Sequence, residues 1–425
     1  MQRFVCAVLL GLLTGTAGAI DYRAGPDDYR DHLRHLQPGD RLLLEPGDYL
    51  QGLPLHGLSG RAGQPIVIAA SNPAMPPRFM ARPRANTVSL VDVRYLVLRD
   101  LELDGRNQPV DAVKAEGHSH FADFVTLERL YIHDYAASQQ NVGISTKCPA
   151  FAWLVKANRI ERVGTGMYFG DADGSAPFVG GVIEANHVTR TLGYSLQIKH
   201  QTARLAEFVG HPVEYTNRHD TLIRYNLFSK ADALPNPQAR PNVLLGHLPL
   251  KGVGSADRYL VYGNVFLHNP SEALLQAEGR IAVYDNVFIN GSGDAIHIQP
   301  HNDVPRDMAI FSNTVLVSGI GIQIRSAANA AYRQRVIGNV VAAVMPLLGG
   351  EAAHNLTLAY RPDCLKATVS GLTSCLFAKN PPPHRLPDVL VHELAAYPDW
   401  KPVEHGSPGA HIPPVLSRTL GSLQP

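Results

Sequence analysis

The chain has 425 residues, enough for two or three ordinary domains, and 45% of them are hydrophobic, as in a globular protein. Its 38 Lys and Arg nearly balance 37 Asp and Glu, and the formal net charge is +1. The chain therefore lacks the basic excess of a nucleic-acid-binding protein, and we expect no nucleic-acid partner. The 37 glycines and 32 prolines indicate a fold with many turns.

The first nineteen residues have the pattern of a signal peptide. Arg3 supplies the charged start, Phe4–Leu13 the short apolar core, and Ala17–Ala19 a small-residue cleavage site. The apolar run is too short to cross a bilayer, and no other segment approaches that length. We expect residues 1–19 to be removed and the mature protein, from about Ile20, to be periplasmic or secreted, with no membrane partner.

Residues 20–37 are expected to form an N-terminal cap. Within them Pro26–Leu36 is amphipathic, with Tyr29, Leu33 and Leu36 on one helical face. A short helix in this place would cover the open edge of the first strands and block edge-to-edge pairing.

The strongest pattern is a repeated Asn-x-apolar step. It occurs at Asn158, Asn186, Asn226, Asn264, Asn286, Asn313 and Asn339. The intervals are 28, 40, 38, 22, 27 and 26 residues, and a second short apolar-x-apolar strand follows most of the steps. Short strands and turns with a period in the twenties predict a β-solenoid. The asparagines are expected to stack at a turn and to bond backbone groups, so we assign them a structural role.

The period extends upstream if Asp100 and Arg129 replace the asparagine. We therefore predict an all-β chain, a single-domain right-handed parallel β-helix over residues 38–376 with an N-terminal helical cap. Residues 377–425 include Pro381–Pro383 and are expected to form a Pro-rich C-terminal cap or tail.

Three cysteines remain after removal of the signal peptide. Cys364 and Cys375 would close a short loop by pairing in an oxidising compartment. The alternative is that these two and Cys148 are unpaired buried thiols, and the sequence leaves the choice open.

Counting from each asparagine predicts two outward columns on one face of the solenoid. The first contains Tyr168, Gln197, Gln276, His297 and Gln323, and the second, two residues further on, contains Gly170, Lys199, Glu278, Gln299 and Arg325. Outward positions are normally polar, so a solvated face is the alternative to a functional one. The functional interpretation is favoured because ionisable side chains gather on a few coils. In addition, the extra residues of the two longest intervals lie in Gln201–Asp220 and Lys230–Asn242, two insertions that flank the same coils.

Two N-terminal segments carry a family resemblance. They read Pro38-Gly-Asp-Arg-Leu-Leu-Leu-Glu-Pro-Gly-Asp-Tyr49 and Ser59-Gly-Arg-Ala-Gly-Gln-Pro-Ile-Val-Ile-Ala-Ala70. They resemble the first coils of right-handed parallel β-helix proteins, most of all the chondroitinase B and alginate lyase group, polysaccharide lyase family six.

The resemblance implies a base Lys on one coil, an Arg on the next and a calcium site just before the Lys. Lys199 matches the base and His247 matches a His on the following coil, whereas no Arg stands beside it. The segment before Lys199 lacks the family's Glu-x-Glu, so we expect no metal ion and no other cofactor, and calcium stays open as the alternative.

These residues predict a polysaccharide lyase that acts by β-elimination on an acidic, uronate-containing glycan. Lys199 is the expected base, and His247 or Tyr168 the expected acid. The residues expected to bind the polysaccharide are Gln197, His200, Arg240, Lys251, Glu278, His297, Gln299 and Arg325. Two alternatives stay open: a mannuronan-type C5 epimerase and a non-catalytic glycan-binding or surface protein.

Overall fold

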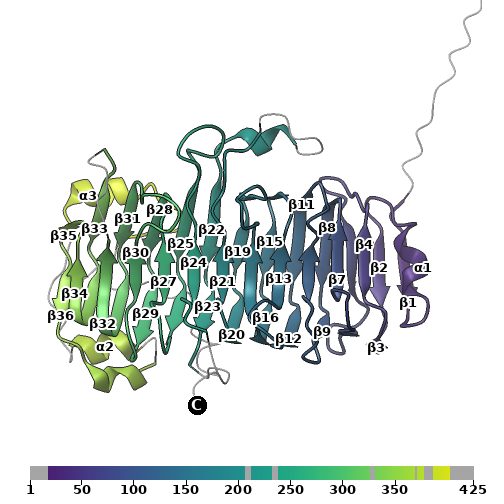
Figure 1. The fold of residues 1–425 in the computed structure, drawn as a ribbon, viewed down its shortest axis with the longest axis horizontal. Helices are drawn as coiled ribbons and strands as arrows, with labels where there is room; N and C mark the ends of the chain where they lie inside the picture. The colour runs from purple at the N-terminus through teal and green to yellow at the C-terminus, as the bar shows by residue number, and fades with distance from the viewer. Residues whose placement is uncertain are drawn as a thin grey trace, which may run out of the picture.

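The chain folds into an elongated helix of parallel β-strands (Figure 1). The computed structural model describes residues 18–205, 212–231, 238–325, 331–368, 371–377 and 386–402. All pairings between its strands are parallel, which confirms the predicted all-β parallel β-helix. Most of the predicted signal peptide and much of the Pro-rich tail lie outside the described residues.

One 15-stranded sheet runs the length of the molecule, and we call it stack A. It contains β1 (Asp21–Ala24), β2 (Arg41–Leu44), β5 (Ile66–Ala70), β8 (Val93–Arg99), β11 (Ala122–Glu128), β14 (Ala150–Phe151), β15 (Leu154–Lys156), β18 (Phe178–Val179), β19 (Val182–Glu184), β22 (Asp220–Arg224), β25 (Arg258–Tyr262), β28 (Ile281–Tyr284), β31 (Met308–Phe311), β33 (Gln334–Ile337) and β35 (Glu351–Ala353).

A 21-stranded sheet forms the other two faces, which join where β32 (Thr314–Ile324) and β34 (Val340–Leu348) run through both. Stack B contains β3 (Asp48–Tyr49), β6 (Arg78–Met80), β9 (Glu102–Asp104), β12 (Tyr131–Tyr135), β16 (Arg159–Val163), β20 (His187–Thr191), β23 (Leu227–Ser229), β26 (Val265–Leu267), β29 (Val287–Asn290) and β36 (Leu356–Leu358). Stack C contains β4 (Leu53–His56), β7 (Val88–Val91), β10 (Val113–Ala115), β13 (Val142–Thr146), β17 (Thr165–Phe169), β21 (Leu196–Ile198), β24 (Val243–Leu245), β27 (Leu275–Ala277) and β30 (Ile296–Ile298).

Alternate residues of each strand point inward and fill the helix with apolar side chains. A single cluster of buried residues extends from Ala24 to Ala343 and includes Val261, Val283 and Ile310 from successive strands of stack A. Because each coil packs only on its neighbours, the core is one continuous column and the chain needs no division into domains.

The repeated asparagines form a buried ladder between stacks A and B. The side-chain oxygen of Asn264 accepts the backbone and side-chain N–H groups of Asn226, both at 2.9 Å, and Asn264 donates to Asn286 in turn. The ladder begins at Asn158 and continues beyond Asn339 to Asn355. This confirms the structural role predicted for the asparagines.

Asp100 and Arg129, which were predicted to replace the asparagine in the upstream coils, lie one residue before the asparagine position. Strand register aligns Asp100 and Arg129 with Ala157, the residue before Asn158, and all three have a positive φ. The residue at this position has a left-handed backbone conformation and bends each coil. In the coil of Arg129, Leu130 therefore takes the place of the asparagine. Arg129 donates from Nε and one terminal guanidinium nitrogen to the two carboxylate oxygens of Asp100 on the preceding coil.

A short helix covers the N-terminal end, as predicted. Helix α1 (Tyr29–Leu33) buries Tyr29, Leu33 and the nearby Leu36, so the predicted apolar face is the one that packs. Strand β1 already pairs with β2, which places the first coil inside the segment expected to be a cap.

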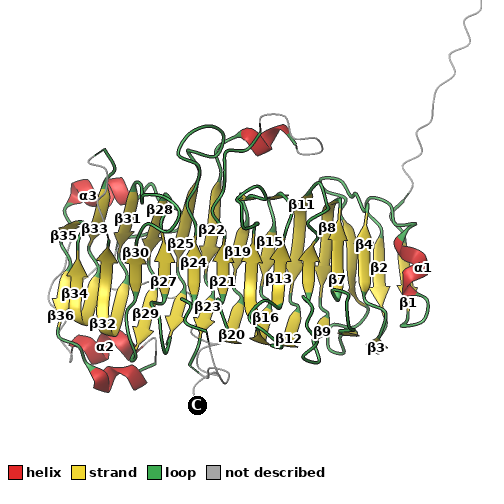
Figure 2. Cartoon of the chain, in the orientation of Figure 1, coloured by secondary structure: helices red, strands yellow, loops and turns green. Residues whose placement is uncertain are grey.

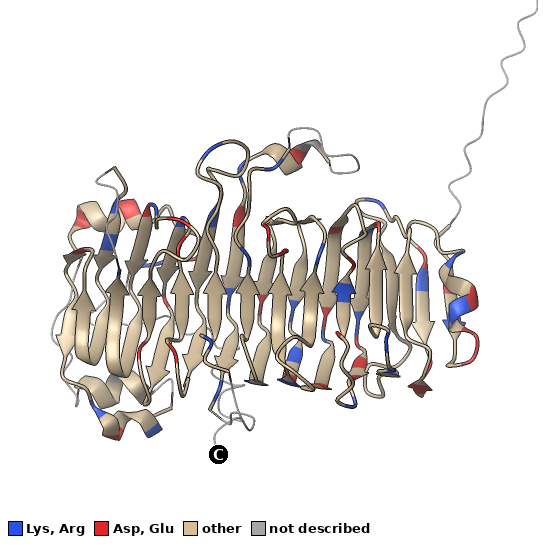
Figure 3. Cartoon of the chain, viewed as in Figure 1, with Lys and Arg blue, Asp and Glu red and all other residues tan. Residues whose placement is uncertain are grey.

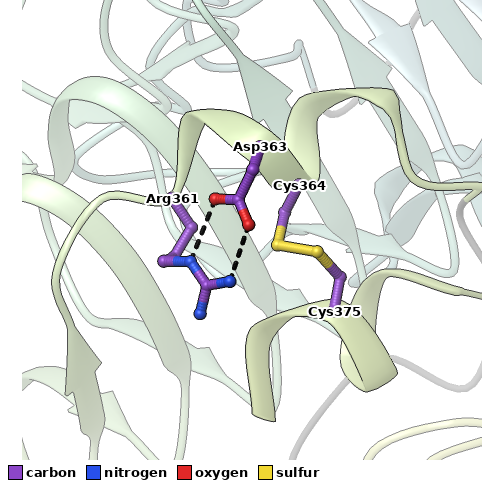
Figure 4. Close-up of a disulfide and its surroundings, with 4 residues drawn as sticks. All are labelled: Arg361, Asp363, Cys364 and Cys375. Atoms are coloured by element: carbon purple, nitrogen blue, oxygen red, sulfur yellow. Dashed lines mark hydrogen bonds and ion pairs between the residues drawn. A yellow bond between two sulfur atoms is a disulfide. The ribbon is translucent and has the colours of Figure 1, made fainter. Parts of the chain in front are cut away.

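The C-terminal segment packs along the sides of the β-helix (Figure 2). The 3-10 helix η2 (Pro362–Lys366) and helix α2 (Leu372–Phe377) cover the outside of stack B. Cys364 and Cys375 form a disulfide between them (Figure 4), which settles the pairing left open by the sequence. Helix α3 (Asp388–Leu394) and Trp400 cover the outside of stack A.

Two of the three faces are therefore covered in the later coils, and stack C carries the predicted columns. Among the described residues, no helix is both long and apolar enough to cross a membrane.

Candidate functional site

The strand register confirms the first predicted column. In stack C, Tyr168 pairs with Gln197, Gln276 with His297, and His297 with Gln323. Leu244, on the coil between Gln197 and Gln276, stands in the same column. Upstream, the column continues through Ser145 and Lys114.

A groove of about 460 Å³ opens on stack C over β10, β13, β17 and β21. Four predicted site residues line it: Tyr168, Gln197, Lys199 and Arg240. The groove also contains four chemically functional residues that the sequence reasoning did not select: Asp111, Lys114, Lys147 and Tyr194.

Lys147 and Tyr168 form the centre of this groove. The Lys147 Nζ lies 3.8 Å from the centroid of the Tyr168 ring, donates to the Gly170 carbonyl at 3.3 Å and is 3.9 Å from an oxygen of Asp171. Burial lowers the pKa of Lys147, and Lys114 and Lys199 act in the same direction, whereas Asp171 opposes them. Burial also raises the pKa of Tyr168 to about 12, so its hydroxyl keeps its proton at neutral pH.

Lys199 directly follows strand β21, two coils beyond Lys147 in the same position. Between them stands Gly170, where an added Cβ would approach the Lys199 Cβ to 3.0 Å. The glycine, with φ +99°, thus places no side chain in the column between the two lysines. In the part of the chain that the structure describes, no hydrogen bond or ion pair holds the Lys199 side chain, which leaves it available to a ligand.

Arg240 reaches the groove from the second predicted insertion. Its guanidinium lies 5.9 Å from the ring centroid of Tyr194. Its carbonyl accepts hydrogen bonds of 2.8 Å from both the Lys230 Nζ and the Asn269 side chain, which fix the backbone beneath it. Lys230 is only 2% exposed, and burial lowers its pKa to about 7.

The first insertion packs elsewhere. Arg204 forms a buried ion pair with Asp257, and Tyr215 packs on Phe151 and Val179. These contacts attach the described ends of Gln201–Asp220 beside stack A, and none of the described residues of this insertion lines the groove.

Asp111 is the one carboxylate among the described residues that line the groove. It accepts the Val142 N–H at 2.9 Å and the Ser145 hydroxyl at 3.2 Å, and it lies 3.6 Å from the Lys114 ammonium. Burial raises the pKa of Asp111, and these bonds oppose the shift. Asp111 therefore serves to position Lys114 and strand β13.

Three predicted residues lie just beyond the groove, in the turns that follow stack C. His200 and His247 stack with ring centroids 5.4 Å apart, and Lys251 is exposed in a later turn. Burial lowers the pKa of His200, and His247 and Lys199 add to the effect. His247 is thus a neighbour of Lys199 through His200 and does not line the groove.

Glu278 occupies a structural position. It is 1% exposed, and its oxygens accept the backbone N–H groups of His247, His301, Asn302 and Asp303. Its carboxylate therefore holds two turns in place. Because both of its oxygens already accept these bonds, Glu278 is not placed to contact substrate, contrary to the prediction.

The remaining predicted residues form a separate strip on later coils. His297 is 2.8 Å from a carboxylate oxygen of Asp294, Gln299 bonds Gln276 at 3.5 Å, and Arg325 is exposed. None of the three lines the groove described above.

One signal would have identified Lys147. It occupies the same position after its strand as Lys199, but its coil lacks the asparagine from which the columns were counted. The turn before β13, residues 136–141, is also longer than the turn of the next coil, where residue 164 alone joins β16 to β17, so a fixed count misses the residue.

A group that meets the geometric requirements for a metal site lies on stack B, where Asp104, His133 and Asp134 approach one another. His133 bonds Asp134 at 2.7 Å and Glu102 at 3.2 Å, and Arg162 holds both oxygens of Asp134. These partners explain the cluster as an ion-pair network. The described lining of the groove has one carboxylate, whereas Ca²⁺ takes six to eight oxygen ligands. The expectation of no metal stays a prediction.

No protein-family model and no curated protein sequence matches the chain. Solved structures do resemble it. The lacto-N-biosidase of family GH136 from Eubacterium ramulus superposes with a TM-score of 0.50 at 14% identity, over 80% of this chain and 68% of that one. At this identity the likeness concerns the fold alone.

Other similar structures superpose less closely. The pectate lyase Pel9A gives a TM-score of 0.49 at 14% identity, over 87% of this chain and 86% of that one. An alginate lyase from Paenibacillus sp. str. FPU-7 gives 0.44 at 14% identity, over 80% and 98%. The chain is a right-handed parallel β-helix protein, and solved polysaccharide lyases are among the structures to which its fold is similar.

Proposed function

We propose that the protein is an exported polysaccharide lyase that cleaves an acidic, uronate-containing glycan by β-elimination in the groove on stack C. The observation that carries the proposal is that three cationic side chains, Lys147, Lys199 and Arg240, line the same groove as Tyr168, whose raised pKa keeps its hydroxyl protonated. An open groove of this kind suits a polymer better than a small molecule.

The groove offers a group for each requirement of the reaction. Lys199, as the base, takes the proton from the carbon that bears the carboxylate, and the electron pair of that C–H bond forms the new C=C bond. The bond to the leaving glycosidic oxygen breaks, and the Tyr168 hydroxyl supplies the proton that this oxygen needs. Arg240 and Lys147 stabilise the charge that develops on the substrate carboxylate.

Tyr168 is preferred to His247 as the acid. Tyr168 lines the groove on the coil before Lys199, about 4.8 Å away along the stack, whereas His247 lies outside the groove and donates from Nδ1 to the Leu248 carbonyl. A C5 epimerase would begin with the same proton abstraction but would return a proton to carbon, and it would produce no unsaturated product.

Export is supported by two features. The N-terminal nineteen residues have the signal-peptide pattern, and the Cys364–Cys375 disulfide is of the kind that persists in an oxidising compartment. N-terminal sequencing of material recovered outside the cytoplasm checks this part of the proposal, and mature protein that still begins at Met1 would contradict it.

The activity test uses alginate, pectate, chondroitin sulfate and dermatan sulfate, and follows the ultraviolet absorbance of the new C=C bond. We expect one of these glycans to be cleaved and the Lys199→Ala variant to be inactive at an unchanged melting temperature. Lys156→Ala, which removes a similar charge from stack A, is the matched control. Full activity of the Lys199 variant would move the site to the strip of His297, Gln299 and Arg325. A product with inverted C5 configuration and no absorbance would identify an epimerase.

A further inference from the structure

The groove continues toward the N-terminal cap as a trough along stack C. A second hollow shares Asn86, Pro109 and Val110 with the groove. A third hollow shares Gln51, Pro54 and His56 with the second and ends at helix α1. The three hollows are therefore continuous over β4, β7, β10, β13, β17 and β21.

Positive charge is concentrated in this trough. The two outer hollows add Arg30, Arg34, Arg82 and Arg84 to the four Lys and Arg residues of the groove. Against these eight cations the described lining has three carboxylates, although the whole chain is balanced at 38 to 37. Figure 3 shows Lys and Arg on the N-terminal part of the β-helix as well as near its middle.

Two of the three carboxylates already have partners. Asp111 lies beside Lys114, and Glu116 accepts a hydrogen bond of 3.0 Å from the Asn86 side chain. Arg82 and Arg84 are exposed, so their guanidinium groups are available to a ligand. The field in the trough is thus strongly positive and favours an anion.

We propose that the trough is an extended binding site for one linear acidic glycan, whose chain runs along the axis of the β-helix from the groove to the N-terminal cap. This inference rests on the proposed function and adds the length, direction and charge of the substrate. Carboxylates or sulfates at regular intervals along the glycan would contact the Arg and Lys side chains that successive coils present.

The dimensions fix the size of the bound segment. Six successive strands of stack C separated by about 4.8 Å span roughly 24 Å, which corresponds to about five sugar units of an extended chain. The lining of the two outer hollows contains no Trp, Tyr or Phe among the described residues. Aromatic rings are the usual platforms for neutral sugars, so an acidic chain fits this surface better.

The trough is also one-sided. On the coil after Gln197 the column carries Leu244, an apolar side chain, in the position held by Tyr168 and Gln197. Most of the bound sugars should therefore lie on the N-terminal side of the reacting bond.

The test measures binding of acidic oligosaccharides of defined length, from dimer to octamer, to the inactive Lys199→Ala protein by titration calorimetry. The glycan is the one that the wild-type protein cleaves. We expect the affinity to rise with length up to about five sugars and then to level off. The affinity should fall as salt is added, because exposed charges are screened.

Charge removal then locates the contacts. In the Lys199→Ala background, Arg82→Gln combined with Arg84→Gln should weaken octamer binding about tenfold, the effect of two exposed charge contacts. The matched control, Arg61→Gln with Lys401→Gln, removes two exposed charges outside the trough and should leave octamer binding unchanged. Melting temperatures establish that each variant is folded.

The outcomes separate the two proposals. Affinity that levels off at three sugars, or octamer binding that is unchanged by the Arg82 and Arg84 substitutions, overturns the trough while the lyase proposal stands. Equal binding of a neutral oligosaccharide of the same length overturns the role of charge. A wild-type protein that neither cleaves nor binds any acidic glycan overturns both.

Discussion

Replacing one asparagine in the middle of the ladder should destabilise the whole β-helix. Asn264 is 1% exposed. Its side-chain oxygen accepts two N–H groups of Asn226, and its side-chain nitrogen donates to the carbonyls of Ile223 and Tyr262 and to Asn286. Asn264→Ala removes all five bonds and brings no group that replaces them.

The cost follows from the groups left behind. The backbone N–H of Asn226 loses its acceptor in a buried place, and the carbonyl of Ile223 loses a donor. Each unsatisfied buried group costs about 1–3 kcal/mol, so we expect a loss of about 4 kcal/mol in the free energy of unfolding. Urea unfolding followed by far-ultraviolet circular dichroism measures this loss.

The end of the same ladder provides the control. Asn355 accepts two bonds from Asn339 and donates one to the Val336 carbonyl, but it is only partly buried. Water can replace its bonds, and Asn355→Ala should cost about 1 kcal/mol. Equal losses at Asn264 and Asn355, or a loss below about 1 kcal/mol at Asn264, would refute the claim that the buried ladder stabilises the fold.

Three further predictions concern the groove and the C-terminal segment. Tyr168→Phe keeps the ring beneath Lys147 and removes only the proton donor, so kcat should fall by on the order of 10² while KM changes little; equal kcat would exclude Tyr168 as the acid. The native pKa of Lys230, about 7, is below its unfolded value, so the unfolded state binds more protons between these values and stability rises with pH. The difference in unfolding free energy between the wild type and Lys230→Met should shift by about 2 kcal/mol in favour of the wild type from pH 6 to pH 9. If this difference does not change with pH, the lowered pKa is contradicted. Removing the Cys364–Cys375 disulfide should cost about 3 kcal/mol of local stability, seen as faster amide hydrogen exchange in η2 and α2 with stack C unaffected.

The features with a strict repeat were predictable from the sequence. The asparagine step gave the parallel fold, the ladder and the register of Tyr168 with Gln197, because one buried hydrogen-bonding position recurs in each coil. The same reasoning misplaced Asp100 and Arg129 by one residue. Their coils keep the left-handed bend but have Leu101 and Leu130 in place of Asn at the next position, and a pattern of residue types does not distinguish the two positions.

The composition of the groove was only partly predictable. Lys199, Tyr168, Gln197 and Arg240 line one groove, whereas Lys147 was missed because its coil has no asparagine from which to count. Glu278 stands in the predicted second column but turns its carboxylate to backbone N–H groups. Whether an ionisable side chain faces a ligand or a turn depends on loop geometry, which the repeat does not specify.

The position of the groove follows from how the three faces of the β-helix are used. In the later coils, η2 and α2 cover stack B, and α3 with Trp400 covers stack A, so their outer side chains are apolar and serve to attach the C-terminal segment. The ladder between stacks A and B fixes the stacking of coils independently of the side chains on stack C. Stack C can therefore carry cations such as Lys147 and Lys199, whose mutual repulsion would destabilise a smaller domain. Lys147 and Lys199 lie two coils apart with Gly170 between them, an arrangement that adds nothing to the core and is accounted for if a substrate carboxylate binds between the two.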